Sequence, residues 1–180
     1  MKTGAVTYHS NDHIAVITLN RAKGMNRLDS DIVNGLETAW TKFMASCDDR
    51  VAIITGDGTS FSAGADLKAI PHDLFRAIPG VGVPVDKPVI AAVNGVAYAG
   101  GWALVQMCDL VVASETARFA ITEAKVGRGM PWAVPLTHMI PQKVLLEILM
   151  TGDPVSAQRS YEIGFVNHVV PADQLMPKAL

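Results

Sequence analysis

Two short turns built from small residues are the segments of this sequence best suited to chemistry. Residues 61–67 read Phe-Ser-Ala-Gly-Ala-Asp-Leu, and residues 99–101 read Ala-Gly-Gly. Each turn follows an apolar run, so uncovered backbone N–H groups can converge on one point. Converging N–H groups stabilise an oxygen that becomes negative during a reaction, most strongly where water is excluded. The pair of turns therefore favours a site that stabilises an oxyanion over the alternative that these glycines only permit tight turns.

The second turn also predicts the start of a helix at Gly100. A helix N-terminus presents free N–H groups and the positive end of a dipole, which favours a developing anion. Side chains larger than those of alanine or glycine would block the approach of a substrate carbonyl, which explains the residue types on either side.

Other catalytic patterns fail on inspection. Gly56-Asp57-Gly58 suggests a dinucleotide loop, but Phe61 occupies the place of the third glycine, and no glycine loop is followed by Gly-Lys-Ser/Thr. The 5 histidines are scattered without ligand spacing, so no metal site is expected. Ser62 lacks the Gly-x-Ser-x-Gly elbow of a serine nucleophile.

Composition indicates one domain, residues 1–180, with an aliphatic core. The chain is 49% hydrophobic and carries a formal net charge of -2, which gives no electrostatic reason to expect nucleic acid or an acidic membrane surface. Cys47 and Cys108 are too far apart for a Cys-x-x-Cys pair, and we expect two reduced, buried thiols in a cytoplasmic protein. The N-terminus lacks the layout of a secretory signal.

One stretch, residues 89–108, is uncharged and long enough on paper to cross a bilayer. Asn94, Gln106 and three glycines stand against a membrane span, as does a strand-like first half followed by a helix-like second half. A buried strand, turn and helix is therefore the preferred interpretation, and no membrane partner is expected.

Alternating strand and helix patterns predict the α/β class. The segment 70–87 contains several prolines and glycines, and we expect it to form a loop with a short turn near 73–77. Strands are expected at 6–9, 14–19, 51–55, 89–93, 110–113 and 165–170. Helices are expected from Asp29 or Ser30 through Met44, at 100–107, at 142–150, after a Ser156 cap up to Gly164, and from Pro171.

Five motifs in order along the chain resemble the crotonase, or enoyl-CoA hydratase/isomerase, superfamily. They are Phe-Ser-Ala-Gly-Ala-Asp-Leu, Lys-Pro-Val-Ile-Ala-Ala-Val-Asn-Gly, Met-Cys-Asp-Leu, Ser-Glu-Thr-Ala-Arg-Phe and Leu-Met-Thr-Gly-Asp-Pro-Val-Ser-Ala-Gln. The resemblance implies a crotonase-like fold of repeated ββα units that form two roughly perpendicular sheets surrounded by helices. It also implies assembly as a homotrimer or dimer of trimers.

For the site, the resemblance implies an acyl-CoA thioester as substrate. The family's oxyanion hole then falls on the N–H groups of Ala65 and Gly100, and its CoA contacts fall on Ala65, Asp66, Leu67 and Lys68. Asp66 is expected to cap a helix rather than to act as an acid.

The sequence departs from the hydratase pattern at one of two glutamate positions. Glu123 matches the later glutamate, whereas the earlier position holds Ala103, which cannot move a proton. Two glutamates can hold a water between them, but a single glutamate more simply shuttles one proton. Some isomerases and aryl-acyl hydratase-lyases of the family also keep only the later glutamate.

Two further departures follow Glu123. Trp132 stands where relatives have more glycines, and it is expected either to line the acyl pocket or to serve packing alone. Relatives also continue into helices that cover the pocket, whereas this chain stops at Leu180, so it is expected to be a core domain lacking the family's C-terminal helices.

The expected function is an acyl-CoA-processing enzyme of the enoyl-CoA hydratase/dehydratase type. A thioester enolate would be stabilised by Ala65 and Gly100, with Glu123 as acid/base, and CoA would belong to the substrate without a metal or other cofactor. Two alternatives stay open: a double-bond isomerase that uses one glutamate, and a non-catalytic acyl-CoA-binding or RNA-associated member of the fold.

Overall fold

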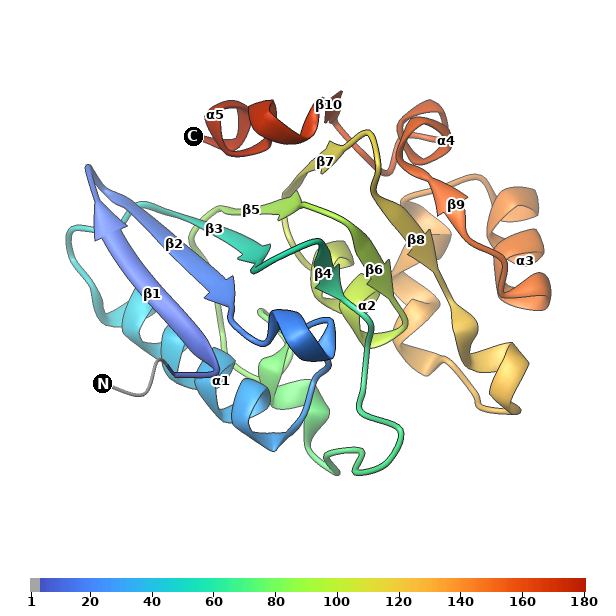
Figure 1. Cartoon of the computed structure of the whole chain (residues 1–180), viewed down its shortest axis with the longest axis horizontal. Coiled ribbons are helices and arrows are strands. Elements are labelled where there is room, and N and C mark those ends of the chain that lie inside the picture. Colours follow the sequence, from blue (N-terminus) through green and yellow to red (C-terminus); the bar gives the residue numbers. More distant parts are fainter. Residues whose placement is uncertain (1–3) are drawn as a thin grey trace.

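The computed structural model describes residues 4–180 and contains two β-sheets with helices packed around them (Figure 1). The larger sheet has six strands in the order β1-β2-β3-β5-β7-β10, and the smaller has four in the order β4-β6-β8-β9. From β3 to β8, successive strands alternate between the sheets: β3, β5 and β7 enter the larger, and β4, β6 and β8 the smaller. The α/β class and the two-sheet architecture are confirmed.

The larger sheet is formed by β1 (Val6–Asn11), β2 (Ile14–Leu19), β3 (Val51–Gly56), β5 (Val89–Val93), β7 (Leu110–Ser114) and β10 (His168–Val170). Its strands are parallel except for the β1–β2 hairpin. The central strands β3, β5 and β7 are buried on both faces over most of their length, which explains their continuous apolar runs in the sequence. Helix α1 (Ser30–Ala45) covers one face and α5 (Leu175–Ala179) the other, where Ile53, Ala92 and Val112 pack against Leu175 and Ala179.

The smaller sheet consists of β4 (Ser60–Ser62), β6 (Val96–Tyr98), β8 (Arg118–Ala120) and β9 (Val155–Ser156). The remaining helices are α2 (Gly100–Gln106), α3 (Gln142–Thr151) and α4 (Ala157–Glu162). Five 3₁₀ segments complete the described chain: η1 (Ala22–Gly24), η2 (Leu74–Ala77), η3 (Thr122–Val126), η4 (Pro131–His138) and η5 (Ala172–Gln174).

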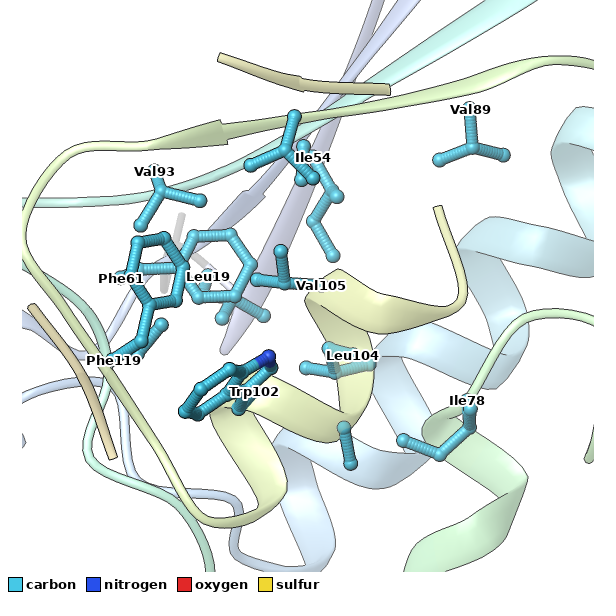
Figure 2. Packing of buried hydrophobic residues seen from close by; sticks show 14 of the residues in the cluster. Leu19, Ile54, Phe61, Ile78, Val89, Val93, Trp102, Leu104, Val105 and Phe119 are labelled. Carbon is cyan, nitrogen blue, oxygen red and sulfur yellow. The ribbon is translucent and has the colours of Figure 1, made fainter. Parts of the chain in front are cut away.

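The aromatic core joins α2 to the smaller sheet. Trp102 of α2 lies 5.5 Å from Phe119 of β8 and 5.3 Å from Phe165, measured between ring centroids. Figure 2 shows Trp102 beside Phe119, with Phe61 of β4 nearby. Trp40 is also fully buried and donates its indole N–H to the Ala77 carbonyl oxygen at 2.9 Å, so its predicted core role is confirmed.

Most long elements agree with the sequence. Helix α1 begins after an Asp29 cap that accepts the Ile32 N–H, and Ser156 caps α4 by accepting the Arg159 N–H. Residues 89–108 fold as strand β5, a turn, the short strand β6 and helix α2, so the expected strand, turn and helix are present but β6 was not predicted. Within the described residues, no helix is long and apolar enough to cross a membrane.

Several boundaries were predicted wrongly. The first hairpin turns at Asp12 and His13, both with positive φ, because β1 extends to Asn11. The last strand begins at His168 because the Phe165 and Val166 N–H groups both donate to the Ser160 carbonyl oxygen, which closes the end of α4 instead.

Cys47 also differs from expectation. It is exposed because it lies in the turn after α1 rather than in an apolar run, whereas Cys108 is largely covered, and burial raises the pKa of its thiol. Both cysteines are free.

Candidate active site

The smaller sheet brings three distant turns to one edge. Strands β4, β6 and β8 are neighbours and run parallel, so their carboxyl ends meet at the same side of the sheet. Ala65, Gly100 and Glu123 each follow one of these ends by two or three residues. Ligand sites in parallel sheets form outside the carboxyl ends of the strands, and a cavity of ≈ 470 Å³ lies here.

Hydrogen bonds on either side of Ala65 fix the direction of its N–H. The Leu28 N–H donates to the Gly64 carbonyl oxygen at 2.8 Å, and the Asp66 N–H donates to the Leu28 carbonyl oxygen at 3.3 Å. In such a parallel bridge the intervening N–H, that of Ala65, points away from the partner strand. Within residues 4–180 the Ala65 N–H donates to no acceptor, and it faces the cavity that Ala65 lines.

The backbone of Ala99, the residue before Gly100, is strained and directs Gly100 toward the same cavity. Ala99 has φ 48° and ψ -118°, a conformation rarely adopted by residues with a side chain, and its N–H is tied to the Ala120 carbonyl oxygen at 2.8 Å. Strain of this kind persists where the surrounding structure holds it and often marks a functional site. It directs the chain so that Gly100 begins α2 with its N–H unpaired among the described residues.

Glycines let the two turns approach closely. Gly64 has φ +86°, and a Cβ on it would lie 2.8 Å from the Tyr98 carbonyl oxygen and 3.2 Å from the Gly100 nitrogen. A Cβ on Gly100 would lie 3.6 Å from the Ala65 nitrogen. The Ala65 and Gly100 backbones therefore lie close together at the cavity wall.

Glu123 lines the same cavity from η3. The Trp132 indole N–H donates to its Oε1 at 2.8 Å, while Oε2 is buried without a partner among the described residues. Burial raises the pKa of the Glu123 carboxyl, and the bond from Trp132 opposes that rise. A carboxyl with a raised pKa exchanges protons more readily near neutral pH, as a general acid/base requires.

The remaining wall of the cavity is mainly apolar. Ala103 faces it from α2, one turn beyond Gly100, so no carboxylate stands opposite Glu123 at that position. The loop 70–87 supplies several apolar lining residues: Ile70, Leu74, Phe75, Ile78 and Val81. The polar or charged side chains in the lining are Gln106, Thr122, Glu123, Arg128 and the indole of Trp132.

The predicted substrate contacts divide into two groups. Ala65, Leu67, Gly100 and Trp132 line the cavity with Glu123. Asp66 and Lys68 do not line it: Lys68 is exposed, and Asp66 lies at a separate polar depression, 3.9 Å from Arg27 between the charged atoms.

The expected helix cap at Asp66 is wrong, because no helix follows this residue. Its Oδ1 accepts the Lys68 N–H at 3.1 Å and closes a turn instead.

Two features of the site went unpredicted. The Trp132–Glu123 bond joins residues on opposite sides of an irregular segment that contains Gly127 and Gly129, where no periodic pattern exists. Gln106 stands in the sequence as a polar residue in an apolar run, and its spacing of three from Ala103, which places both on one side of a helix, is the signal that could have found it.

Comparisons with known proteins all point to one family. A family model described as enoyl-CoA hydratase/isomerase matches residues 9–180. The (E)-benzylidenesuccinyl-CoA hydratase of Thauera aromatica is 36% identical over 94% of this chain and 71% of its own length. The carnitinyl-CoA dehydratase of Salmonella enteritidis is 39% identical over 94% of this chain and 69% of its own length.

A solved structure shows the same fold. The enoyl-CoA hydratase from Mycobacterium tuberculosis superposes with a TM-score of 0.92 at 34% identity, covering 98% of this chain and 73% of that one. The chain belongs to the enoyl-CoA hydratase/isomerase family.

Proposed function

We propose that this protein is an acyl-CoA-processing enzyme of the hydratase/dehydratase type. The observation that carries the proposal is the convergence of the Ala65 N–H, the Gly100 N–H and Glu123 on one cavity. A thioester oxygen accepting both N–H groups would be stabilised as it gains charge, which promotes an enolate. The relatives named above are a hydratase and a dehydratase of CoA thioesters, which favours this direction of chemistry.

Glu123 is the proposed acid/base for the proton that the enolate gains or loses. Its unpaired Oε2 is the oxygen free to meet a substrate, since Oε1 is held by Trp132. The proposal needs no metal or cofactor apart from the CoA of the substrate. The N–H pair would stabilise the enolate, and the carboxyl of Glu123 would transfer the proton. Ala65, Asp66, Leu67 and Lys68 remain the proposed contacts for CoA.

Double-bond isomerisation is the second candidate, and Ala103 is the observation that favours it. Hydration adds the hydroxyl of a water to one carbon and a proton to the next, for which two carboxylates are well suited, whereas isomerisation moves one proton between carbons. With alanine opposite Glu123, a single-carboxylate reaction is the simpler one.

Turnover of a panel of trans-enoyl-CoAs tests the proposal. Loss of the conjugated thioester absorbance, with chromatography of the products, separates 3-hydroxyacyl-CoA from the shifted double-bond isomer. We expect hydration in at least one member of the panel. Tight binding of the panel without any conversion would instead identify a non-catalytic acyl-CoA-binding protein.

We further propose a cytoplasmic protein that assembles as a homotrimer or dimer of trimers. Two free cysteines support a reducing compartment. Exposed apolar side chains on η3, η4 and α3, among them Val126, Val134 and Met150, are suited to burial between subunits. Light scattering tests the assembly, and a monodisperse monomer would contradict it.

A further inference from the structure

Gln106 is a buried amide in an otherwise apolar helix. It is 5% exposed, lies at the end of α2, and lines the cavity described above. Its Oε1 atom is covered from solvent and has no hydrogen-bond partner among residues 4–180. A buried acceptor without a partner is costly, so the few that occur call for an explanation.

The orientation of the amide is fixed by its other end. Gln106 Nε2 donates to the Trp132 carbonyl oxygen at 2.5 Å. A carbonyl oxygen can only accept, so the amide nitrogen must face it, and turning the amide over would oppose two acceptors. The Oε1 atom is therefore fixed as the acceptor end of a side chain that lines the cavity.

One candidate donor in the protein is the indole N–H of Trp102, four residues earlier on α2, which also has no partner among the described residues. Trp102 is held between Phe119 and Phe165 and does not line the cavity. The two groups form no hydrogen bond with each other. The acceptor of Gln106 thus has no partner among residues 4–180, although its side chain lines the cavity in which a ligand would bind.

The position of Gln106 along α2 indicates which part of a ligand would meet it. Six residues of helix separate it from Gly100, a rise of about 9 Å along the axis. Ala103 lies between them on the same cavity wall, next to the place where the reacting carbons would be. Gln106 is therefore beyond the reacting carbons, alongside the more distant part of an acyl group.

We infer that Gln106 is a specificity residue whose Oε1 accepts a hydrogen bond from a hydroxyl on the distal part of the acyl group. The substrate class is then hydroxylated acyl-CoA rather than plain alkyl acyl-CoA. This inference rests on the proposed function, because it places an acyl-CoA in the cavity. A site built to bond a substrate hydroxyl discriminates strongly against the analogue that lacks it, since its own polar group is then left unpaired.

Paired substrates test the inference. Each pair consists of a trans-enoyl-CoA and its hydroxylated analogue, with the hydroxyl on successive carbons beyond the double bond. The ratio of kcat/KM within each pair is measured for the wild type, Gln106→Met and Met107→Leu. Methionine matches the length of glutamine without its amide, and Met107→Leu reshapes the same cavity without a polar change.

We expect the wild type to prefer at least one hydroxylated member by about tenfold or more. Gln106→Met should abolish that preference, whereas Met107→Leu should keep it. A purely structural role would lower both members of a pair equally and leave the ratio unchanged. The inference is overturned if the wild type shows no preference in any pair, or if Gln106→Met retains it.

Binding measurements distinguish a failure of this inference from a failure of the proposed function. If no pair is turned over, the proposed reaction fails, and the preference is measured as the ratio of Kd values by calorimetry. A Kd ratio that favours the hydroxylated member and disappears in Gln106→Met would still support the inference, whereas equal Kd values would overturn it.

Discussion

The two sheets differ in what they contribute. The larger sheet has strands of up to six residues, its central strands are buried on both faces, and none of the proposed catalytic residues lies in it. The smaller sheet has strands of only two or three residues, yet Ala65, Gly100 and Glu123 all follow its strand ends. The difference teaches that long apolar strands supply stability here, while a few short parallel strands set the positions on which chemistry depends.

Short strands need support beyond their own ladder bonds, and a buried asparagine supplies much of it. Asn26 is fully buried with φ 51°, and its Nδ2 donates to the carbonyl oxygens of Ser60, at 2.7 Å, and Asp57, at 3.0 Å. Ser62 Oγ donates in turn to the Asn26 carbonyl oxygen at 2.8 Å. This polar network fixes β4, and with it the turn that carries Ala65.

Replacing the carboxyl of Glu123 should have the largest effect on turnover. Glu123→Gln keeps the size of the side chain but removes its titratable group, so kcat should fall by ~10²–10⁴ while acyl-CoA binding persists. Stopped-flow turnover and calorimetric Kd values measure the two quantities. Glu147→Gln, an exposed position on α3, is the matched control. Undiminished turnover in Glu123→Gln would remove this residue from the mechanism.

A methyl group at Gly100 should come next. Its carbon would stand 3.6 Å from the Ala65 nitrogen, in the space proposed for the thioester oxygen, while Leu28 Cδ1 at 3.0 Å is the end of a flexible side chain and can move. Loss of the oxyanion contacts should reduce kcat/KM by ~10²–10³.

Gly129→Ala is the control for this change. Gly129 also lines the cavity, but its added Cβ would have no atom within 4 Å. Equal kinetics for Gly100→Ala and Gly129→Ala would contradict the assignment of the N–H pair.

Two core substitutions should separate the roles of the sheets. Ile54→Ala in β3 truncates a fully buried side chain and should lower the free energy of unfolding by about 2–5 kcal/mol, with kcat of the folded protein unchanged. Asn26→Ala should cost about 1–3 kcal/mol through unpaired backbone groups, yet it should also reduce kcat because β4 loses its anchor. Denaturant titrations measure the free energy of unfolding of each variant, and kcat is measured at denaturant concentrations below the unfolding transition. A lower kcat in Ile54→Ala together with an unchanged kcat in Asn26→Ala would refute the division of roles.

The smallest effect is expected at Trp132. Its bond to Glu123 lowers a pKa that burial raises, so Trp132→Phe should raise the pKa of Glu123 further. The limb of the kcat/KM profile that reports Glu123 should then move to higher pH. A limb that stays in place or moves to lower pH would show that this bond does not tune the carboxyl.

Strands β2, β3, β5 and β7 of the larger sheet could be predicted from the sequence because they are largely apolar runs of five or six residues. Strands β4, β6, β8 and β9 are too short to show a period, and none of them was predicted as a strand. Ala65, Gly100 and Glu123 were nevertheless found through motifs, since the residue types at these turns are specific.

The support of Glu123 by Trp132 and the unpaired oxygen of Gln106 could not be predicted. Both depend on how irregular segments pack across the cavity, and a sequence pattern does not specify such contacts.

Exchange of the α-proton of a saturated acyl-CoA with D₂O, followed by proton NMR, tests the central claim most directly. Exchange requires only that the N–H pair stabilise an enolate and that Glu123 remove the proton, so it does not depend on which overall reaction follows. We predict enzyme-dependent loss of the α-proton signal in the wild type and in Gly129→Ala, and its absence in Glu123→Gln and Gly100→Ala. Exchange at the wild-type rate in Glu123→Gln and Gly100→Ala would contradict the account.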